Sequence, residues 1–168
     1  LRECGHTADV VTTPQNRFGR RLSAYCATWL TDVEVAGDGG PVGRVISLRF
    51  PSYAVRHPCQ VVWLNHRMRE YYDLWDDFRA GLGTRGRLVE GARRATIHFL
   101  DGRLLRRRTV IAQSKTVQAR LRRWGGISSD VLYPPPPQRD YRCEEYNGSI
   151  LVVGGLTPLK RVDLLIRA

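Results

Sequence analysis

Short runs of apolar residues recur along the chain, and segments long enough to form helices separate most of them. The runs are continuous and rich in β-branched residues, which is typical of strands that are covered on both faces of a parallel sheet. Six runs predict strands, at residues 7–13, 45–48, 60–64, 110–113, 130–133 and 150–153.

Apolar positions recur with helical spacing between these runs. They predict helices over residues 20–30, 69–78, 87–107 and 114–124, the third of which can break at Gly91 or Gly102. The last of these helices has the clearest boundaries, because Ser114 can cap its start and the pair Gly125-Gly126 can end it. Strands that alternate with helices predict an α/β fold with a largely parallel sheet.

The final segment, residues 149–168, joins the predicted strand at 150–153 to the pair Gly154-Gly155 and to a helix that follows at once. Thr157 can cap this helix, and Pro158 suits its first turn because no backbone N–H is needed there. Such a unit aims free N–H groups and the positive end of the helix dipole at one spot. The segment therefore predicts an anion site, with phosphate as the first candidate.

The length of 168 residues suits one domain, or one domain with a fragment of another. Hydrophobic residues make up 42% of the chain, yet no apolar run is long enough to span a membrane and no signal-peptide pattern opens the sequence. Because the chain starts at Leu1 and stops inside a predicted helix, we expect it to be truncated at both ends. Scattered cysteines without a CxxC pair argue against zinc and predict reduced thiols in a cytosolic protein. They are Cys4, Cys26, Cys59 and Cys143.

The formal net charge is +11, and arginine supplies nearly all of the excess, since Lys115 and Lys160 are the only lysines. Such a surface attracts nucleic acids, anionic lipid head groups or nucleotides. Two arginine clusters stand out, Arg106-Arg107-Arg108 and the group Arg120, Arg122 and Arg123. They indicate either a basic docking face or an ordinary solvated surface. No zinc-finger, RRM or KH signature accompanies them, so we expect no specific nucleic-acid partner.

Six motifs in a fixed order carry a family resemblance. They are FPSYAVRHP at 50–58, VWLNH at 62–66, YDLW at 72–75, AQS at 112–114, VLYPP at 131–135 and LKRVDLLI at 159–166. In this order they resemble the retaining, nucleotide-sugar-dependent glycosyltransferases of family four, also called group 1 glycosyltransferases. The resemblance covers nearly the whole chain.

The resemblance implies the GT-B architecture, in which two Rossmann-like domains enclose the active site between them. Residues 1–135 would then form an N-terminal acceptor-side domain, incomplete at its start, and residues 136–147 a linker. Residues 148–168 would be the first strand and helix of the C-terminal domain that binds the nucleotide sugar. The family's glycine-rich acceptor loop and its paired-glutamate motif have no counterpart here.

On the donor side, the resemblance assigns Lys160, with Gly154 and Gly155, to the diphosphate of the nucleotide sugar. A lysine there would neutralise charge on the leaving group as the sugar departs; the alternative is a solvated lysine on a helix. Gly155 departs from the family, which usually has an arginine at this position as a second phosphate clamp. Arg161 is adjacent but points at a different angle on the predicted helix.

On the acceptor side, the resemblance places a histidine near the reacting sugar or a donor phosphate, and His66 is the candidate catalytic residue. The alternative is a histidine that caps the next helix. Further candidates for acceptor or phosphate contacts are Arg49, Pro51, Tyr53, Arg69 and Ser114. For Arg49, Pro51 and Tyr53, the alternative is simple packing of their loop. For Arg69 it is a solvated helix arginine, and for Ser114 a helix cap. His57 and His98 are interpreted as structural.

Together these features predict transfer of a hexose, with retention, from a nucleoside diphosphate sugar to a glycan or lipid-linked acceptor. No tightly bound cofactor or metal is expected. The protein would be cytoplasmic, and an anionic lipid surface at the inner face of the membrane is a candidate partner. We expect this chain alone to turn over no sugar. Two alternatives stay open: a basic module that binds nucleic acid or anionic membrane, and a non-catalytic glycosyltransferase relative.

Overall fold

The computed structural model describes residues 1–12, 21–136, 142, 145, 148–156 and 160–167. The chain divides into two compact units, Leu1–Pro134 and Pro135–Ala168.

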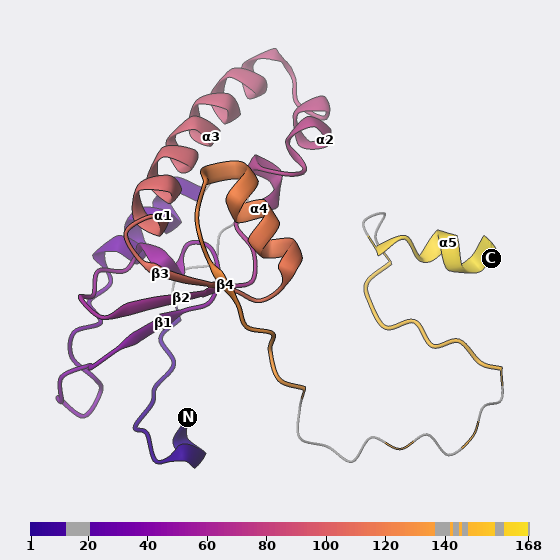
Figure 1. Ribbon diagram of the computed structural model, residues 1–168. Coiled ribbons are helices and arrows are strands. Elements are labelled where there is room, and N and C mark those ends of the chain that lie inside the picture. Colours follow the sequence, from indigo (N-terminus) through magenta and orange to yellow (C-terminus); the bar gives the residue numbers. More distant parts are fainter. Residues whose placement is uncertain (13–20, 137–141, 143–144, 146–147, 157–159, 168) are drawn as a thin grey trace. The chain divides into compact units, whose positions relative to one another are not determined.

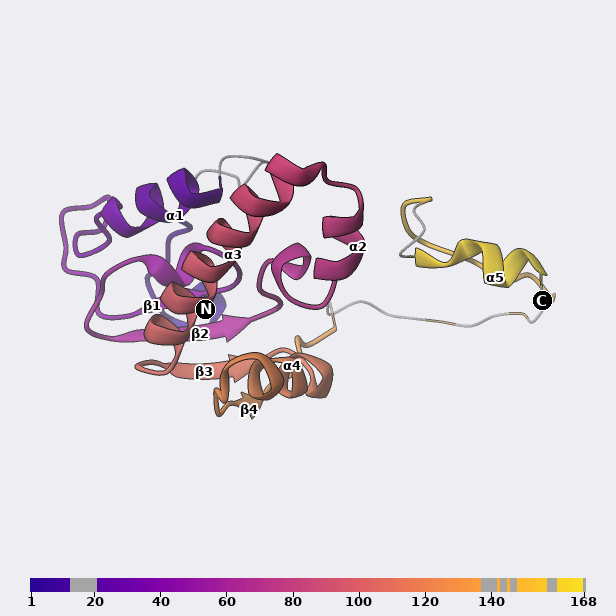
Figure 2. The same cartoon turned by 90° about the horizontal axis from the view of Figure 1, so that it is seen from above.

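The first unit is built on a four-stranded parallel sheet. Its strands are β1 (Val45–Ser47), β2 (Gln60–Leu64), β3 (Thr109–Ala112) and β4 (Asp130–Val131). They lie in the order β1-β2-β3-β4, which Figures 1 and 2 show side by side. In the register of the two central strands, Val62 stands opposite Val110 and Leu64 opposite Ala112. The predicted α/β class with a parallel, Rossmann-like sheet is therefore confirmed.

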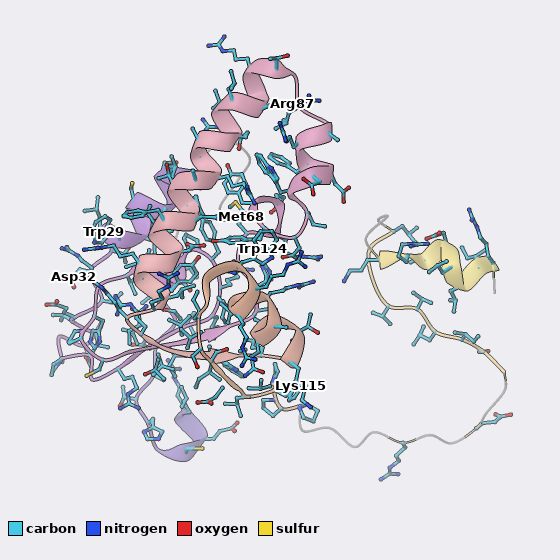
Figure 3. All side chains as sticks on the ribbon, turned by 45° about the horizontal axis from the view of Figure 1, so that its top comes forward. Trp29, Asp32, Met68, Arg87, Lys115 and Trp124 are labelled. Atoms are coloured by element: carbon cyan, nitrogen blue, oxygen red, sulfur yellow. The ribbon has the colours of Figure 1, made fainter. Side chains whose placement is uncertain are left out.

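The helices of this unit are α1 (Arg21–Leu30), α2 (Trp75–Ala80), α3 (Thr84–Leu105) and α4 (Lys115–Gly125). Figure 1 draws them above the sheet. Their buried side chains, such as Tyr25, Ile97 and Leu121, join one core cluster with Val62 and Leu64. Met68 and Trp124, both labelled in Figure 3, belong to the same packing region.

Burial alternates along β2, where residues 60, 62 and 64 are buried while Val61 and Trp63 are only half-buried. The sequence predicted strands that are covered on both faces. Among the described residues, β2 is fully covered on one face only. Side chains of a strand alternate between the two faces of a sheet. A continuous apolar run in the sequence therefore does not indicate how well the second face of its strand is covered.

Two predicted strands do not form. Residues 7–12 have no strand pairing, and Val10 and Val11 are 91% and 61% exposed; residue 13 lies outside the described part. Residues 150–153 are likewise irregular and exposed. A strand needs a neighbour for its backbone N–H and C=O groups. The described residues provide no such neighbour for either segment.

The helix expected over residues 69–78 is divided. A 3-10 turn at Arg69–Tyr71 is followed by α2, and Tyr72 between them has φ −119° and ψ −97°, far from helical values. Tyr71 and Tyr72 are both buried. Successive residues of a regular helix point about 100° apart, so the break lets these two neighbours enter the core together. The long helix α3, in contrast, runs unbroken through Gly91 and Gly102.

The predicted limits of α4 are confirmed. The Ser114 hydroxyl accepts a hydrogen bond from the Val117 N–H at 3.2 Å, and Gly126 ends the helix in the left-handed conformation at φ 59°. A hydroxyl at this position satisfies one of the free N–H groups of the first turn. Glycine adopts a left-handed φ without the steric cost that a Cβ atom brings.

Replacing Ser114 by alanine is expected to lower the free energy of unfolding by about 1 kcal/mol, because the capped N–H loses its acceptor. Urea denaturation followed by tryptophan fluorescence measures the change. Ser129→Ala is the matched control, since the Ser129 hydroxyl is buried without a hydrogen-bond partner among the described residues. An equal loss in both variants would contradict the capping role.

Candidate functional site

The candidate residues of the first unit follow three neighbouring strands. Arg49 comes after β1, His66 after β2 and Ser114 after β3. Backbone hydrogen bonds of 3.0 Å, from Asn65 N–H to Leu48 O and from Gln113 N–H to Leu64 O, tie these strand ends together. Parallel strands end at one edge of a sheet, and ligands of open α/β sheets bind at that edge. The fold therefore gathers these three positions along one edge.

The loop after β1 is held by Ser52. Its hydroxyl oxygen accepts from the N–H groups of Leu48 and Arg49, both at 3.2 Å, and donates to the Arg49 carbonyl at 2.6 Å. Of the three candidates on this loop, Arg49 is exposed, whereas Pro51 and Tyr53 are buried. Arg49 is therefore the only one of the three whose side chain can reach a ligand without movement of the loop.

A small pocket lies beside the loop after β2. Its lining includes His66, Arg67 and Arg69 from this loop, together with Asp73 and Arg120. The Asp73 carboxylate oxygen Oδ2 pairs with Nε of Arg69 and with Nε of Arg120, each at 3.2 Å. The pocket volume of about 20 Å³ holds roughly one water molecule. It is a basic recess in which two of the arginines already share a carboxylate.

The His66 ring has a defined orientation. Its Nδ1 atom lies 2.8 Å from the backbone carbonyl of Arg67. A carbonyl oxygen only accepts hydrogen bonds, so Nδ1 is the nitrogen that carries the proton. In the neutral ring, Nε2 then has the free lone pair and can accept a proton or a hydrogen bond. A neutral His66 in this orientation offers an acceptor, not a donor, at Nε2.

Arg67 was not recognised from the sequence. Its side chain is only 7% exposed, its guanidinium stacks over the Tyr72 ring at 3.9 Å, and Nη2 donates to the Arg120 carbonyl at 3.2 Å. A buried cation needs such partners, because desolvation without them is costly. The residue adjoins His66 in sequence, but no periodicity marked its burial.

Sequence reasoning also missed a buried acid, Asp101, in the last turns of α3. Its two carboxylate oxygens accept hydrogen bonds from the hydroxyls of Tyr53, at 2.6 Å, and Tyr72, at 2.7 Å. Burial raises the pKa of Asp101 to about 6, while these two hydrogen bonds and the Arg67 charge act in the opposite direction. The periodicity of the predicted helix contained no signal for a buried acid at this position.

Two other histidines have structural contacts. His57 donates from Nε2 to the Val42 carbonyl at 2.8 Å and accepts at Nδ1 from the Cys59 N–H at 3.1 Å. His98 stacks on the Tyr72 ring with 4.1 Å between centroids and donates to the Tyr71 carbonyl at 2.7 Å. Burial lowers the pKa of His98, and the charges of nearby arginines add to this effect. Both rings serve packing and backbone hydrogen bonding.

The two arginine clusters are partly engaged within the protein. Arg106 donates twice to the Gly125 carbonyl, and Arg108 donates to the carbonyls of His57 and Val55. Arg120 is paired with Asp73. The remaining members, Arg107, Arg122 and Arg123, are exposed, and so is Arg106. The basic face is therefore smaller than the six arginines of the sequence suggested.

In the second unit, Lys160 comes close to Gly154. Its Cδ atom lies 4.0 Å from the position that a Cβ atom would take at Gly154. The helix that follows, α5 (Val162–Arg167), begins later than the sequence predicted. Thr157 and Pro158, the expected cap and first turn, lie outside the described residues. Gly154 and Gly155 are exposed, and Arg161, before α5, has a positive φ of 50°.

Among the described residues, no group of three or more His, Cys, Asp or Glu side chains is arranged to hold a metal ion. Cys4, Cys26 and Cys59 are exposed free thiols, and Cys143 lies outside the described part. Within that part, no helix combines the length and the apolar character needed to cross a bilayer. Neither family models, nor curated proteins, nor solved structures gave a match to this chain.

Proposed function

We propose that this chain is part of a retaining glycosyltransferase of family four, which transfers a hexose from a nucleoside diphosphate sugar to a hydroxyl group of a glycan or lipid-linked acceptor. One observation carries the proposal: His66, Arg49 and Ser114 follow three successive parallel strands and meet at one edge of the sheet. This is the edge at which α/β proteins bind their ligands. The ordered motifs of the sequence support the same function.

In the proposed reaction, the diphosphate of the donor is bound by Lys160 next to Gly154 and Gly155. The lysine ammonium stabilises the negative charge that develops as the sugar leaves. His66, whose Nε2 can accept a hydrogen bond, is proposed to lie near the reacting sugar, and Arg49 and Arg69 to supply further anion or hydroxyl contacts. No tightly bound cofactor or metal takes part, and positioning supplies much of the remaining rate enhancement.

The proposed enzyme works in the cytoplasm, at the inner face of a membrane when its acceptor is lipid-linked. The exposed residues Arg107, Arg122 and Arg123 offer positive charge to an anionic lipid surface. Each basic residue close to such a surface contributes about 1 kcal/mol of attraction. Charge of this kind supports adsorption of the protein rather than insertion into the bilayer.

The donor site is tested by binding of a nucleoside diphosphate to the whole 168-residue chain. In an NMR titration of ¹⁵N-labelled protein with UDP, GDP or ADP, the amide signals of Gly154, Gly155 and Lys160 are expected to shift. Lys160→Ala should weaken binding at least tenfold, because a charge-assisted contact to phosphate is lost. Lys115→Ala is the matched control, since it removes the only other lysine, at the exposed start of α4 (Figure 3).

Equal weakening by both lysine variants would indicate attraction by net charge alone and would contradict the donor site. The basic-module alternative makes a different prediction in the same experiment. It predicts that generic DNA or RNA binds more tightly than any nucleotide, with an affinity that falls steeply as salt is added. Signals on the exposed arginines, rather than at Lys160, would then shift.

A further inference from the structure

Asp101 joins two loops that are distant in sequence. One carboxylate oxygen, Oδ1, accepts from Tyr53 in the loop after β1, and the other, Oδ2, accepts from Tyr72 in the loop after β2. All three side chains are buried. A hydrogen bond to an ionised, buried group is stronger than one between neutral groups. A single side chain of α3 is therefore bonded to both loops.

Each of these loops carries candidate site residues. Tyr53 lies four residues after Arg49, in the loop that Ser52 closes. Tyr72 directly precedes Asp73, whose carboxylate pairs with Arg69 and Arg120 in the pocket beside His66. In addition to the backbone hydrogen bond from Asn65 to Leu48, the bonded series Tyr53–Asp101–Tyr72 therefore connects the loop of Arg49 to the loop of the basic pocket.

Other titratable and charged groups surround this acid. Arg67 stacks over Tyr72 and lowers the pKa of Asp101, while His98 stacks on the Tyr72 ring. From α1, Tyr25 packs against Tyr53, and burial followed by the Asp101 charge raises the pKa of its hydroxyl. The charge of Arg108 acts in the opposite direction and lowers the pKa of the Tyr25 hydroxyl. The cluster therefore contains one acid, two arginines, one histidine and three tyrosines.

We propose that Asp101 is a positioning residue for the candidate site: its carboxyl group holds the loop after β1 and the loop after β2 in one arrangement, so that both loops respond together to its ionisation. An ionised carboxylate accepts from both tyrosines. A protonated carboxyl group is a weaker acceptor and adds an O–H donor, so its hydrogen bonds to the two tyrosines are expected to weaken or rearrange. The role assigned to the loops rests on the proposed function, whereas their coupling does not.

The test is an NMR pH titration of the folded, ¹³C,¹⁵N-labelled 168-residue chain between pH 4 and 8. The carboxyl carbon of Asp101 and the amides of residues 49–54 and 66–73 are expected to share one transition near pH 6. In Asp101→Asn this shared transition should disappear from both loops. The matched control is Glu90→Gln, a buried acid on the same helix that accepts from Tyr71 in the loop after β2; here the transition should remain.

Tyr72→Phe supplies a second measurement that does not depend on the folding of Asp101→Asn. The variant removes a hydrogen bond that favours the ionised form, so the transition should move upward by about one pH unit. The movement must appear at residues 49–54 as well as at residues 66–73. A transition at residues 49–54 that persists in Asp101→Asn, or a Tyr72→Phe shift confined to residues 66–73, would overturn the proposal. Failure of nucleotide binding would leave these outcomes unaffected.

Discussion

Between pH 4 and pH 6.5, the free energy of unfolding is expected to fall by about 2 kcal/mol more in the wild-type protein than in Asp101→Asn. The carboxyl group has an ordinary pKa of 3.8, and burial raises the pKa to about 6 in the folded protein. Within this window the folded protein retains a proton that the unfolded chain releases. The stabilisation is therefore complete below pH 4 and is lost as pH rises through 6, at 1.36 kcal/mol for each pH unit.

Urea denaturation at several pH values measures this difference. The four tryptophans, Trp29, Trp63, Trp75 and Trp124, all lie in the unit Leu1–Pro134, so their fluorescence reports on that unit. Asp77→Asn, which removes an exposed acid on α2, serves as the control and should retain the wild-type pH dependence. A constant difference between the wild type and Asp101→Asn across this range would show that the acid is not stabilised in its protonated form.

Gly155→Arg is expected to tighten nucleoside diphosphate binding ten- to hundredfold. The substitution supplies the arginine that glycosyltransferases of family four usually have at this position. One added hydrogen bond from a guanidinium to phosphate contributes about 1.5–3 kcal/mol, which corresponds to this range of affinity. Isothermal titration of the chain with UDP, GDP and ADP gives the dissociation constants directly.

The control for this gain is Leu156→Arg, which adds the same charge at the next, exposed position. A generic effect of charge would tighten binding equally in both variants and would contradict a phosphate clamp at residue 155. No gain in Gly155→Arg, together with no effect of Lys160→Ala, would favour the non-catalytic relative. A gain in Gly155→Arg alone would identify residue 155 as the position at which the donor site is weakened.

Elements with strong local signals were predictable from the sequence. The strand β2 occupies the predicted residues 60–64, and α4 has its cap at Ser114 and its end at Gly126. In both cases the deciding interactions lie within a few residues of one another: a compact β-branched run, a capping hydroxyl and a left-handed glycine. The parallel order of the sheet follows from the alternation of such elements.

Features that depend on distant partners were not predictable in this way. The segment at 150–153 resembles a strand in composition, but strand formation requires a neighbouring strand that its own residues cannot supply. The irregular backbone at Tyr72 becomes understandable only with Asp101, 29 residues away in sequence. The edge of the sheet that gathers His66, Arg49 and Ser114 could be inferred from spacing. The burial of Arg67 and Asp101 beside it could not, because charged residues are rarely buried without partners.

Asp73 occupies the space between two guanidinium groups, and this has a consequence for ligand exchange. Any anion that settles between Arg69 and Arg120 must first displace the resident carboxylate, whose Oδ2 lies 3.2 Å from each Nε atom. Binding there is a substitution of one negative group for another rather than the capture of an anion by bare cations. Fewer small counter-ions are released in such a substitution, so the affinity of this pocket would vary less with ionic strength than the net charge of the chain suggests.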